Sequence, residues 1–290
     1  MKNVKRLVTF ILMGLIASTG VVYAKDVKLG IQAPRGALKA MKKWGDIGKY
    51  LTEKTGNKVV LVPLNPSKTV DAVSSGQVQY MLSNPVLAVV LKEKNKSVPI
   101  ATVNRKSGKY FAGVIISKKG SGITKAEHTK GKKGMAFKFK KSAAAYVFQV
   151  KHLMDKGIDP HKDFSSFTEA KKQDDIVLAV KAGLIDVGFV KSGLLEAMAK
   201  EGKIKVSDFE IVDQVSDSLK QVHSTTLYPQ WTMTANADAD PAVTSSIKAA
   251  LLKLTPSDGA SKAAKIRGFV EPLSLEELQN TLKALNLPPY

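Results

Sequence analysis

The stretch from Val73 to Pro85 reads VSSGQVQYMLSNP. Its pattern predicts the end of one helix, then a strand, then the start of a second helix. Gly76 lies where an apolar helical pattern stops, and glycine is the residue most often found just beyond a helix. Residues 78–82 then place apolar side chains at every second position, which is typical of a strand. Ser83-Asn84-Pro85 follows as a helix start, with a capping side chain and proline early in the first turn.

The same order of elements continues on both sides of this stretch. Repeated short units of strand, turn and helix predict parallel sheets with helices on both faces, and they restart once in mid-chain, so we expect two α/β modules. The expected strands are 27–31, 59–62, 99–103, 111–116, 134–138, 164–167, 185–190 and 230–235. The expected helices are 38–51, 142–154, 174–182, 192–200, 242–254 and 275–285.

The first 24 residues have the pattern of a secretory signal. Lys2, Lys5 and Arg6 precede an apolar run of about 16 residues, which is shorter than the roughly 20 that span a bilayer. Small residues before Lys25 predict cleavage after Ala24. We therefore expect an exported protein of the periplasm, and the alternative is an uncleaved membrane anchor.

Charge is distributed unevenly along the chain. The 290 residues include 45 Lys and Arg, 25 Asp and Glu and no Cys, for a net charge of +20. Without the signal the net charge is +17, of which +13 falls between Lys92 and Lys141. Most of these lysines are expected on a solvated face. The turn from Lys138 to Ser142, where a strand meets a helix start, is the candidate for binding an oxyanion, because a helix N-terminus presents free N–H groups.

Motifs of catalysis, metal binding and nucleic-acid recognition are missing from the sequence. The four His do not have zinc-ligand spacing, and the absence of Cys excludes thiolate chemistry. Neither a GxSxG elbow nor a GxxxxGK[ST] phosphate loop occurs. We therefore expect a protein without catalytic residues, metal or cofactor, and no nucleic-acid partner.

Five stretches taken together resemble a known family. They are GIQAPRG (30–36), VSSGQVQYMLSNP (73–85), the Ile158-Asp159-Pro160 turn with Asp163-Phe164, AVKAGLIDVG (179–188) and STTLYPQW (224–231). In this order they resemble the periplasmic phosphate-, phosphite- and phosphonate-type substrate-binding proteins of ABC importers. The match is strongest to a branch that also supplies sensor regions to histidine kinases, including tetrathionate sensors.

This resemblance implies a type II periplasmic-binding-protein fold with two α/β lobes and a two-strand hinge. One lobe would comprise residues 25–112 and 223–290, and the other residues 113–222. A small anion would be bound in the cleft between them. First-lobe ligand candidates are Gln32, Arg35, Ser67, Lys68, Thr69, Ser83 and Asn84. Second-lobe candidates are Lys138, Ser142, Ala143, Lys191 and Ser192, while Tyr110 and Tyr228 near the hinge would wall the cleft. Ser67 and Ser83 have the alternative role of helix caps, and the two tyrosines that of packing.

One departure from the family pattern bears on the ligand. Phosphonate-binding relatives resemble one another in a Ser-Thr-Ser run at the second-lobe helix start, whereas residues 141–145 here read KSAAA, with a single hydroxyl. This departure argues against phosphonate or phosphate itself and favours another or a larger oxyanion. The family resemblance as a whole predicts a monomeric receptor for a phosphonate-, phosphite- or phosphate-like oxyanion that serves an ABC permease. Two alternatives stay open: a ligand-sensing partner of a membrane histidine kinase that binds a sulfur oxyanion such as tetrathionate, and a basic protein that binds anionic envelope surfaces.

Overall fold

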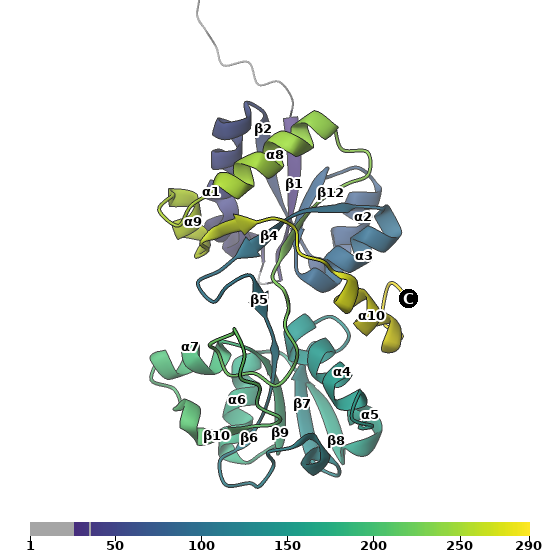
Figure 1. Cartoon of the computed structure of the whole chain (residues 1–290), viewed down its shortest axis with the longest axis vertical. Helices are drawn as coiled ribbons and strands as arrows, with labels where there is room; N and C mark the ends of the chain where they lie inside the picture. Colours follow the sequence, from purple (N-terminus) through teal and green to yellow (C-terminus); the bar gives the residue numbers. More distant parts are fainter. Residues whose placement is uncertain (1–25, 35) are drawn as a thin grey trace, which may run out of the picture.

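The chain folds into two separate sheets, each covered by helices. The computed structural model describes residues 26–34 and 36–290. Figure 1 shows the sheets as two lobes, one above the other, connected by extended segments. The expected export signal lies outside the described residues, as does Arg35. Among the residues described, no helix combines the length and apolar character of a membrane span.

The first lobe is built on a six-stranded sheet with the order β13-β4-β12-β3-β1-β2. β1, β2 and β3 are parallel, β12 is antiparallel to both β3 and β4, and β13 is antiparallel to β4. The strands are β1 (Asp26–Gln32), β2 (Lys58–Leu64), β3 (Tyr80–Ser83), β4 (Val98–Asn104), β12 (Thr232–Ala235) and β13 (Gly268–Val270). The helices are α1 (Ala37–Thr55), α2 (Thr69–Ser74), α3 (Pro85–Asn95), α8 (Pro241–Lys253) and α9 (Gly259–Ala264), with a 3-10 turn η1 (Pro66–Lys68).

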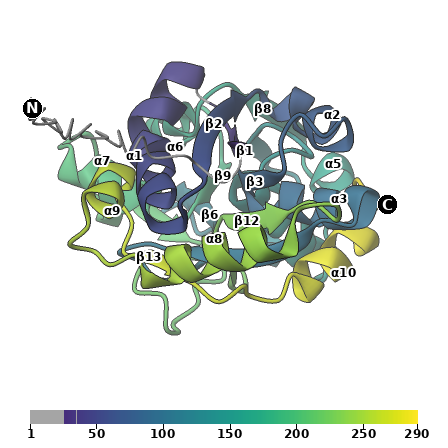
Figure 2. The ribbon, with the colours of Figure 1, turned by 90° about the horizontal axis from the view of Figure 1, so that it is seen from above.

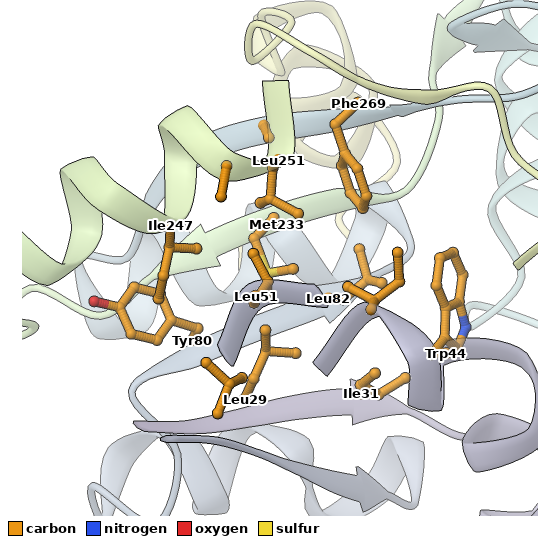
Figure 3. Close-up of a cluster of buried hydrophobic side chains, with 14 of the residues drawn as sticks. Leu29, Ile31, Trp44, Leu51, Tyr80, Leu82, Met233, Ile247, Leu251 and Phe269 are labelled. Atoms are coloured by element: carbon orange, nitrogen blue, oxygen red, sulfur yellow. The ribbon is translucent and has the colours of Figure 1, made fainter. Parts of the chain in front are cut away.

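Two apolar layers hold this lobe together. α1, α8 and α9 pack on one face of the sheet, and α2 and α3 on the other (Figure 2). Figure 3 shows Leu51 of α1, Leu29 of β1 and Leu251 of α8 meeting in the first layer. β3 serves both layers, because Tyr80 belongs to the first and Met81 to the second, as the period-two geometry of a strand requires.

The second lobe is built on a five-stranded sheet with the order β10-β6-β9-β7-β8. β7, β8 and β9 are parallel, whereas β6 is antiparallel to both β9 and β10. The strands are β6 (Gly113–Lys118), β7 (Lys133–Phe137), β8 (Ser166–Ala170), β9 (Val187–Lys191) and β10 (Phe209–Ile211). The helices are α4 (Phe148–Met154), α5 (Pro160–Asp163), α6 (Gln173–Ala182) and α7 (Leu194–Lys200), with short turns η2 (Ala126–Thr129), η3 (Ala143–Val147) and η4 (Val206–Asp208).

Two short antiparallel strands connect the lobes. β5 (Tyr110–Phe111) pairs with β11 (Tyr228–Pro229), so Tyr228 lies opposite Phe111 and Pro229 opposite Tyr110. β5 leads from β4 of the first lobe into β6 of the second, and β11 leads back into β12. This ladder confirms the two-strand hinge that the family resemblance implies.

The C-terminal helix contacts both lobes beside the hinge. α10 (Glu276–Ala284) is held to α3 by Gln279, whose Oε1 accepts from Lys92 Nζ at 2.8 Å and whose Nε2 donates to Glu93 Oε1 at 2.6 Å. On its other side, Thr281 Oγ1 lies 3.1 Å from the hydroxyl of Tyr228 in the hinge. α10 also packs against α4 of the second lobe, so it joins the lobes independently of the two hinge strands.

The structure differs from the sequence predictions in several elements. The strand predicted at 111–116 is interrupted at Ala112, because the chain passes there from the hinge into the second sheet. The helix predicted from Ser142 to Met154 is regular only from Phe148, since Ala144 and Ala145 have non-helical backbone angles. α9, β10 and β13 are elements that the apolar pattern did not predict.

Candidate functional site

The polarity of the strands places the predicted site residues on two facing edges. β4 runs toward the hinge and β12 away from it, so β3, antiparallel to β12, ends at the hinge, as do β1 and β2. β6 leaves the hinge, so β9 ends there, together with β7 and β8. The carboxyl ends of three parallel strands of each sheet therefore lie beside the hinge, which is where α/β sheets bind ligands.

On the first lobe, Gln32 at the end of β1 is bonded to Asn84 at the end of β3. Gln32 Oε1 accepts from the backbone N of Asn84 at 2.9 Å and from its Nδ2 at 3.0 Å. Asn84 Oδ1 in turn caps α3 by accepting from the backbone N of Leu87 at 3.1 Å. Asn84 therefore caps this helix, a role that the sequence equally allowed for Ser83. Ser83 itself is buried, and its hydroxyl donates to the carbonyl of Asn84.

The end of β2 contributes a short turn with one exposed cation. Asn65 caps η1, and its Oδ1 accepts from both the backbone N and the hydroxyl of Ser67 at 3.1 Å. Thr69 is fully buried and donates to the carbonyl of Asn65, so its hydroxyl maintains the turn. Ser67 and Lys68 are exposed at this edge and keep the capacity to contact a ligand.

On the second lobe, the turn after β7 has an unusual backbone. Lys138 and Lys140 have positive φ angles of 46° and 62°, and the backbone N of Phe139 donates to Glu169 Oε2 at 2.6 Å. Ser142 then occupies the N-cap position of η3 but makes no side-chain capping bond. Its hydroxyl and the N–H groups of the first turn, including that of Ala143, lack the partners that a regular capped helix provides. These are donors suited to an oxyanion.

A buried glutamine side chain holds the backbone of this irregular turn by hydrogen bonds. Gln149 is fully buried, and its Nε2 donates to the carbonyls of Ala144 at 2.9 Å, Val190 at 2.8 Å and Val114 at 3.3 Å. One side chain thus connects η3 to the ends of β9 and β6. A Cβ at Gly113 would lie 2.6 Å from the Gln149 side chain, so the close approach requires glycine there.

Lysines at three adjacent strand ends make the second-lobe edge strongly basic. Lys171 and Lys172 follow β8 and are exposed beside the β7 turn, and Lys191 ends β9. Among the described residues, no carboxylate forms an ion pair with any of five of these lysines: Lys138, Lys140, Lys141, Lys171 and Lys172. Such a group of ammonium ions without counter-ions attracts anions to the edge.

Ser192 and Tyr228 are buried, whereas a role in the cleft requires exposed side chains. Ser192 is buried, and its hydroxyl accepts from the backbone N of Ala112 at 3.1 Å. Tyr228 is 1% exposed, and its ring stacks on that of Phe148 with 3.7 Å between the centroids. Its hydroxyl is hydrogen-bonded to Thr281, and burial raises the pKa of this phenol to about 12. Tyr228 is therefore a packing residue in this conformation, whereas Tyr110 is half-buried and stays available.

The structure thus brings together most of the predicted residues and adds others. Arg35 cannot be placed because it lies outside the described residues. Lys171 and Lys172 were missed, because the strand predicted at 164–167 ends three residues earlier than β8, which the two lysines directly follow. Gln149 was also missed, and its signal is a lone amide within the apolar run of residues 146–150.

Two α/β lobes with facing strand ends and a paired hinge define the type II periplasmic-binding-protein fold. A Xanthomonas citri protein solved with bound ATP matches 90% of this chain and 98% of its own, with a TM-score of 0.71 and 18% identity. PhnD1 of Prochlorococcus marinus, solved with methylphosphonate, matches the same shares with a TM-score of 0.68 and 16% identity. Residues 33–276 match the family described as periplasmic substrate-binding proteins of phosphonate ABC transporters, and the chain belongs to this family.

A curated relative has a different architecture. The tetrathionate sensor histidine kinase TtrS of Salmonella typhimurium is 28% identical over 240 residues, which are 81% of this chain. The match covers 40% of the kinase, so this chain spans less than half of that relative's length.

Proposed function

We propose that this protein captures a small oxyanion of the phosphonate, phosphite or phosphate type between its lobes and delivers it to an ABC importer. The observation that carries the proposal is the facing pair of strand edges. One edge presents lysines without carboxylate partners and an uncapped helix start at Ser142. The family supports transport, since its members are described as substrate-binding proteins of ABC transporters.

The location and domain limits follow from the same proposal. The chain would be exported to the periplasm and cleaved after Ala24, and it would act as a monomer. Residues 25–112 and 223–290 would move as one body and residues 113–222 as the other. α10 touches both bodies, so it would have to shift its contacts with α3 or α4 whenever the lobes move.

A second function is favoured by the relationship to TtrS. That relative is named as a tetrathionate sensor, and the match covers 81% of this chain and 40% of the kinase. The protein would then bind a sulfur oxyanion and signal to a membrane histidine kinase. The single hydroxyl in residues 141–145 agrees with a ligand that needs fewer hydroxyl donors than phosphonate.

A thermal-shift series distinguishes these functions. We expect one class of anion among phosphate, phosphite, methylphosphonate, sulfate, thiosulfate and tetrathionate to stabilise the protein. At a hundredfold excess over Kd the gain is about 2.7 kcal/mol, or roughly 5–10 °C in Tm. Preference for phosphorus oxyanions supports import, and preference for sulfur oxyanions supports sensing.

The same series at two salt concentrations tests the third alternative, attachment to anionic envelope surfaces. Exposed charges are screened within about 8 Å at physiological ionic strength, so surface attachment would disappear in high salt. Binding between the lobes should retain most of its stabilisation. If none of the six anions stabilises the protein at either salt concentration, the proposed function is wrong.

A further inference from the structure

Arginine is rare in this basic chain, and one of its few copies lies in the hinge. Arg occurs at positions 6, 35, 105 and 267 only, whereas nearly all other cations are Lys. Arg105 directly follows β4, where its backbone forms a tight turn by exchanging two 3.0 Å hydrogen bonds with Gly108. The guanidinium is therefore attached to the segment that leads from the first lobe into the hinge strand β5.

A buried glutamine fixes the orientation of this guanidinium. Arg105 Nε donates to Gln230 Oε1 at 2.9 Å. Gln230 is 6% exposed, its backbone N donates to the carbonyl of Lys109 at 2.9 Å, and its Nε2 lies 3.4 Å from the carbonyl of Tyr110. Gln230 is thus bonded to the opposite hinge segment and holds Arg105 through a single nitrogen, which leaves both Nη groups available.

The charge of Arg105 is not compensated by the protein. Among the described residues, no carboxylate lies within ion-pair distance of its guanidinium, and no acceptor is bonded to its Nη groups. Burial nevertheless lowers the pKa of Arg105, which reflects the loss of water around the cation. A partly desolvated cation without a counter-ion is unfavourable, and a bound anion would relieve that cost.

Arg105 also lies on the same sheet edge as the residues already described. In the first sheet β4, β12, β3 and β1 are consecutive neighbours, and adjacent strands are about 4.8 Å apart. Arg105 follows β4, Gln230 precedes β12, Asn84 follows β3 and Gln32 ends β1. The guanidinium therefore extends the candidate site along this edge as far as the hinge.

We propose that Arg105, oriented by Gln230, is a ligand-binding residue whose two free Nη groups clamp the anionic group of the ligand from the hinge. A guanidinium with two parallel donors matches a group that presents two oxygens, such as a phosphonate, phosphate, sulfonate or carboxylate. Together with the lysines of the second lobe, the Arg105 guanidinium selects ligands with at least two negative charges, whether these lie on separate groups or on one doubly charged head group. This inference rests on the proposed function.

The test compares Arg105→Met and Arg105→Lys with Arg267→Met by calorimetric titration of inorganic phosphate, methylphosphonate, thiosulfate and tetrathionate. Arg267 is the matched control, because it is exposed and its backbone N is bonded to Asn104, the neighbour of Arg105. For each anion that binds wild-type protein, we expect Arg105→Met to weaken binding about tenfold or more, and Arg105→Lys to cause a smaller loss. Arg267→Met should stay within twofold of wild type.

The melting temperature of the ligand-free protein gives the second readout. Arg105→Met removes an uncompensated cation, so its ligand-free melting temperature should equal or exceed that of wild type. Unchanged affinity in Arg105→Met overturns the inference. If affinity and stability both fall in Arg105→Met, Arg105→Lys decides: wild-type stability with affinity still below wild type supports the clamp, whereas wild-type values of both indicate a structural role.

Failure of the proposed function is distinguishable from failure of this inference. A wild-type protein that binds none of the four anions contradicts the proposed function. In that case the ligand-free proteins still test Arg105: if Arg105→Met melts below wild type and Arg105→Lys melts at the wild-type temperature, the cation stabilises the hinge and the inference is wrong.

Discussion

Replacing Lys138 and Ser142 together by Ala should weaken oxyanion binding about 100-fold. Lys138 follows β7 at the facing edge and has no carboxylate partner among the described residues, and the hydroxyl of Ser142 makes no capping bond. Both groups therefore have donors left for a ligand. Each charge-assisted hydrogen bond contributes about 1.5–3 kcal/mol, so the loss of an ammonium and a hydroxyl together corresponds to roughly two orders of magnitude in Kd.

The control for this pair lies at the other end of the same strand. Lys133 begins β7, is exposed, and is a whole strand away from the hinge edge. Lys133→Ala removes the same charge from the same lobe, and we expect its affinity to stay within twofold of wild type by calorimetry. If Lys133→Ala and the double variant lose affinity equally, the net charge of the lobe explains binding and our site is wrong.

Replacing Gln149 by Met should both destabilise the protein and weaken binding. The substitution keeps the length of the side chain but removes the amide that donates to the carbonyls of Ala144, Val190 and Val114. Leaving buried carbonyls without this donor costs about 1–3 kcal/mol each where no other partner replaces it. Because Ala144 belongs to the irregular first turn of η3, its displacement should also misdirect the N–H groups of that turn. We expect a Kd at least tenfold higher.

Leu153→Ala is the control for Gln149→Met, because it destabilises the protein without removing the hydrogen bonds that position the first turn of η3. Leu153 is fully buried one turn further along α4, and truncating a buried leucine costs about 2–5 kcal/mol. Denaturant unfolding should show both variants destabilised, whereas titration should show a loss of affinity only for Gln149→Met. Selective 15N labelling of alanine adds a direct view of Ala143, Ala144 and Ala145, whose amide signals should move in Gln149→Met. Wild-type affinity in that variant would contradict the role of Gln149.

The sequence predicted the order of the elements because their signals are local. Gly56 ends α1 with a left-handed backbone, and Asn84 with Pro85 begins α3, so helix limits follow from single residues. The facing edges also followed from local order, since predicted site residues such as Gln32, Asn84 and Lys138 lie at or directly after the ends of strands. Parallel strands in one lobe end on the same side, which brings sequence-distant residues such as Gln32 and Asn84 together.

The features that were missed depend on contacts between distant segments. The interruption of the predicted helix at Ala144 has no local breaker, because alanine favours helix. It is accompanied by hydrogen bonds from Gln149 to the carbonyl of Ala144 and to two carbonyls in other strands. Tyr228 is buried by contacts with Phe148 and with α10, and α10 begins more than 40 residues after Tyr228 in the sequence. The partner of Arg105 is Gln230, across the hinge. Apolar periodicity contains none of this information.

The most direct test of the central claim measures the distance between the lobes when an anion binds. The described chain has no cysteine, so Leu38→Cys on α1 and Leu178→Cys on α6 place two spin labels at exposed positions, one in each lobe. With the anion that stabilises the protein most, we predict a shorter distance between the labels and one bound anion per chain. The Lys138→Ala, Ser142→Ala variant should show no shortening at the same anion concentration. Stabilisation without any change in the distance, or an equal response in the variant, would contradict binding between the lobes.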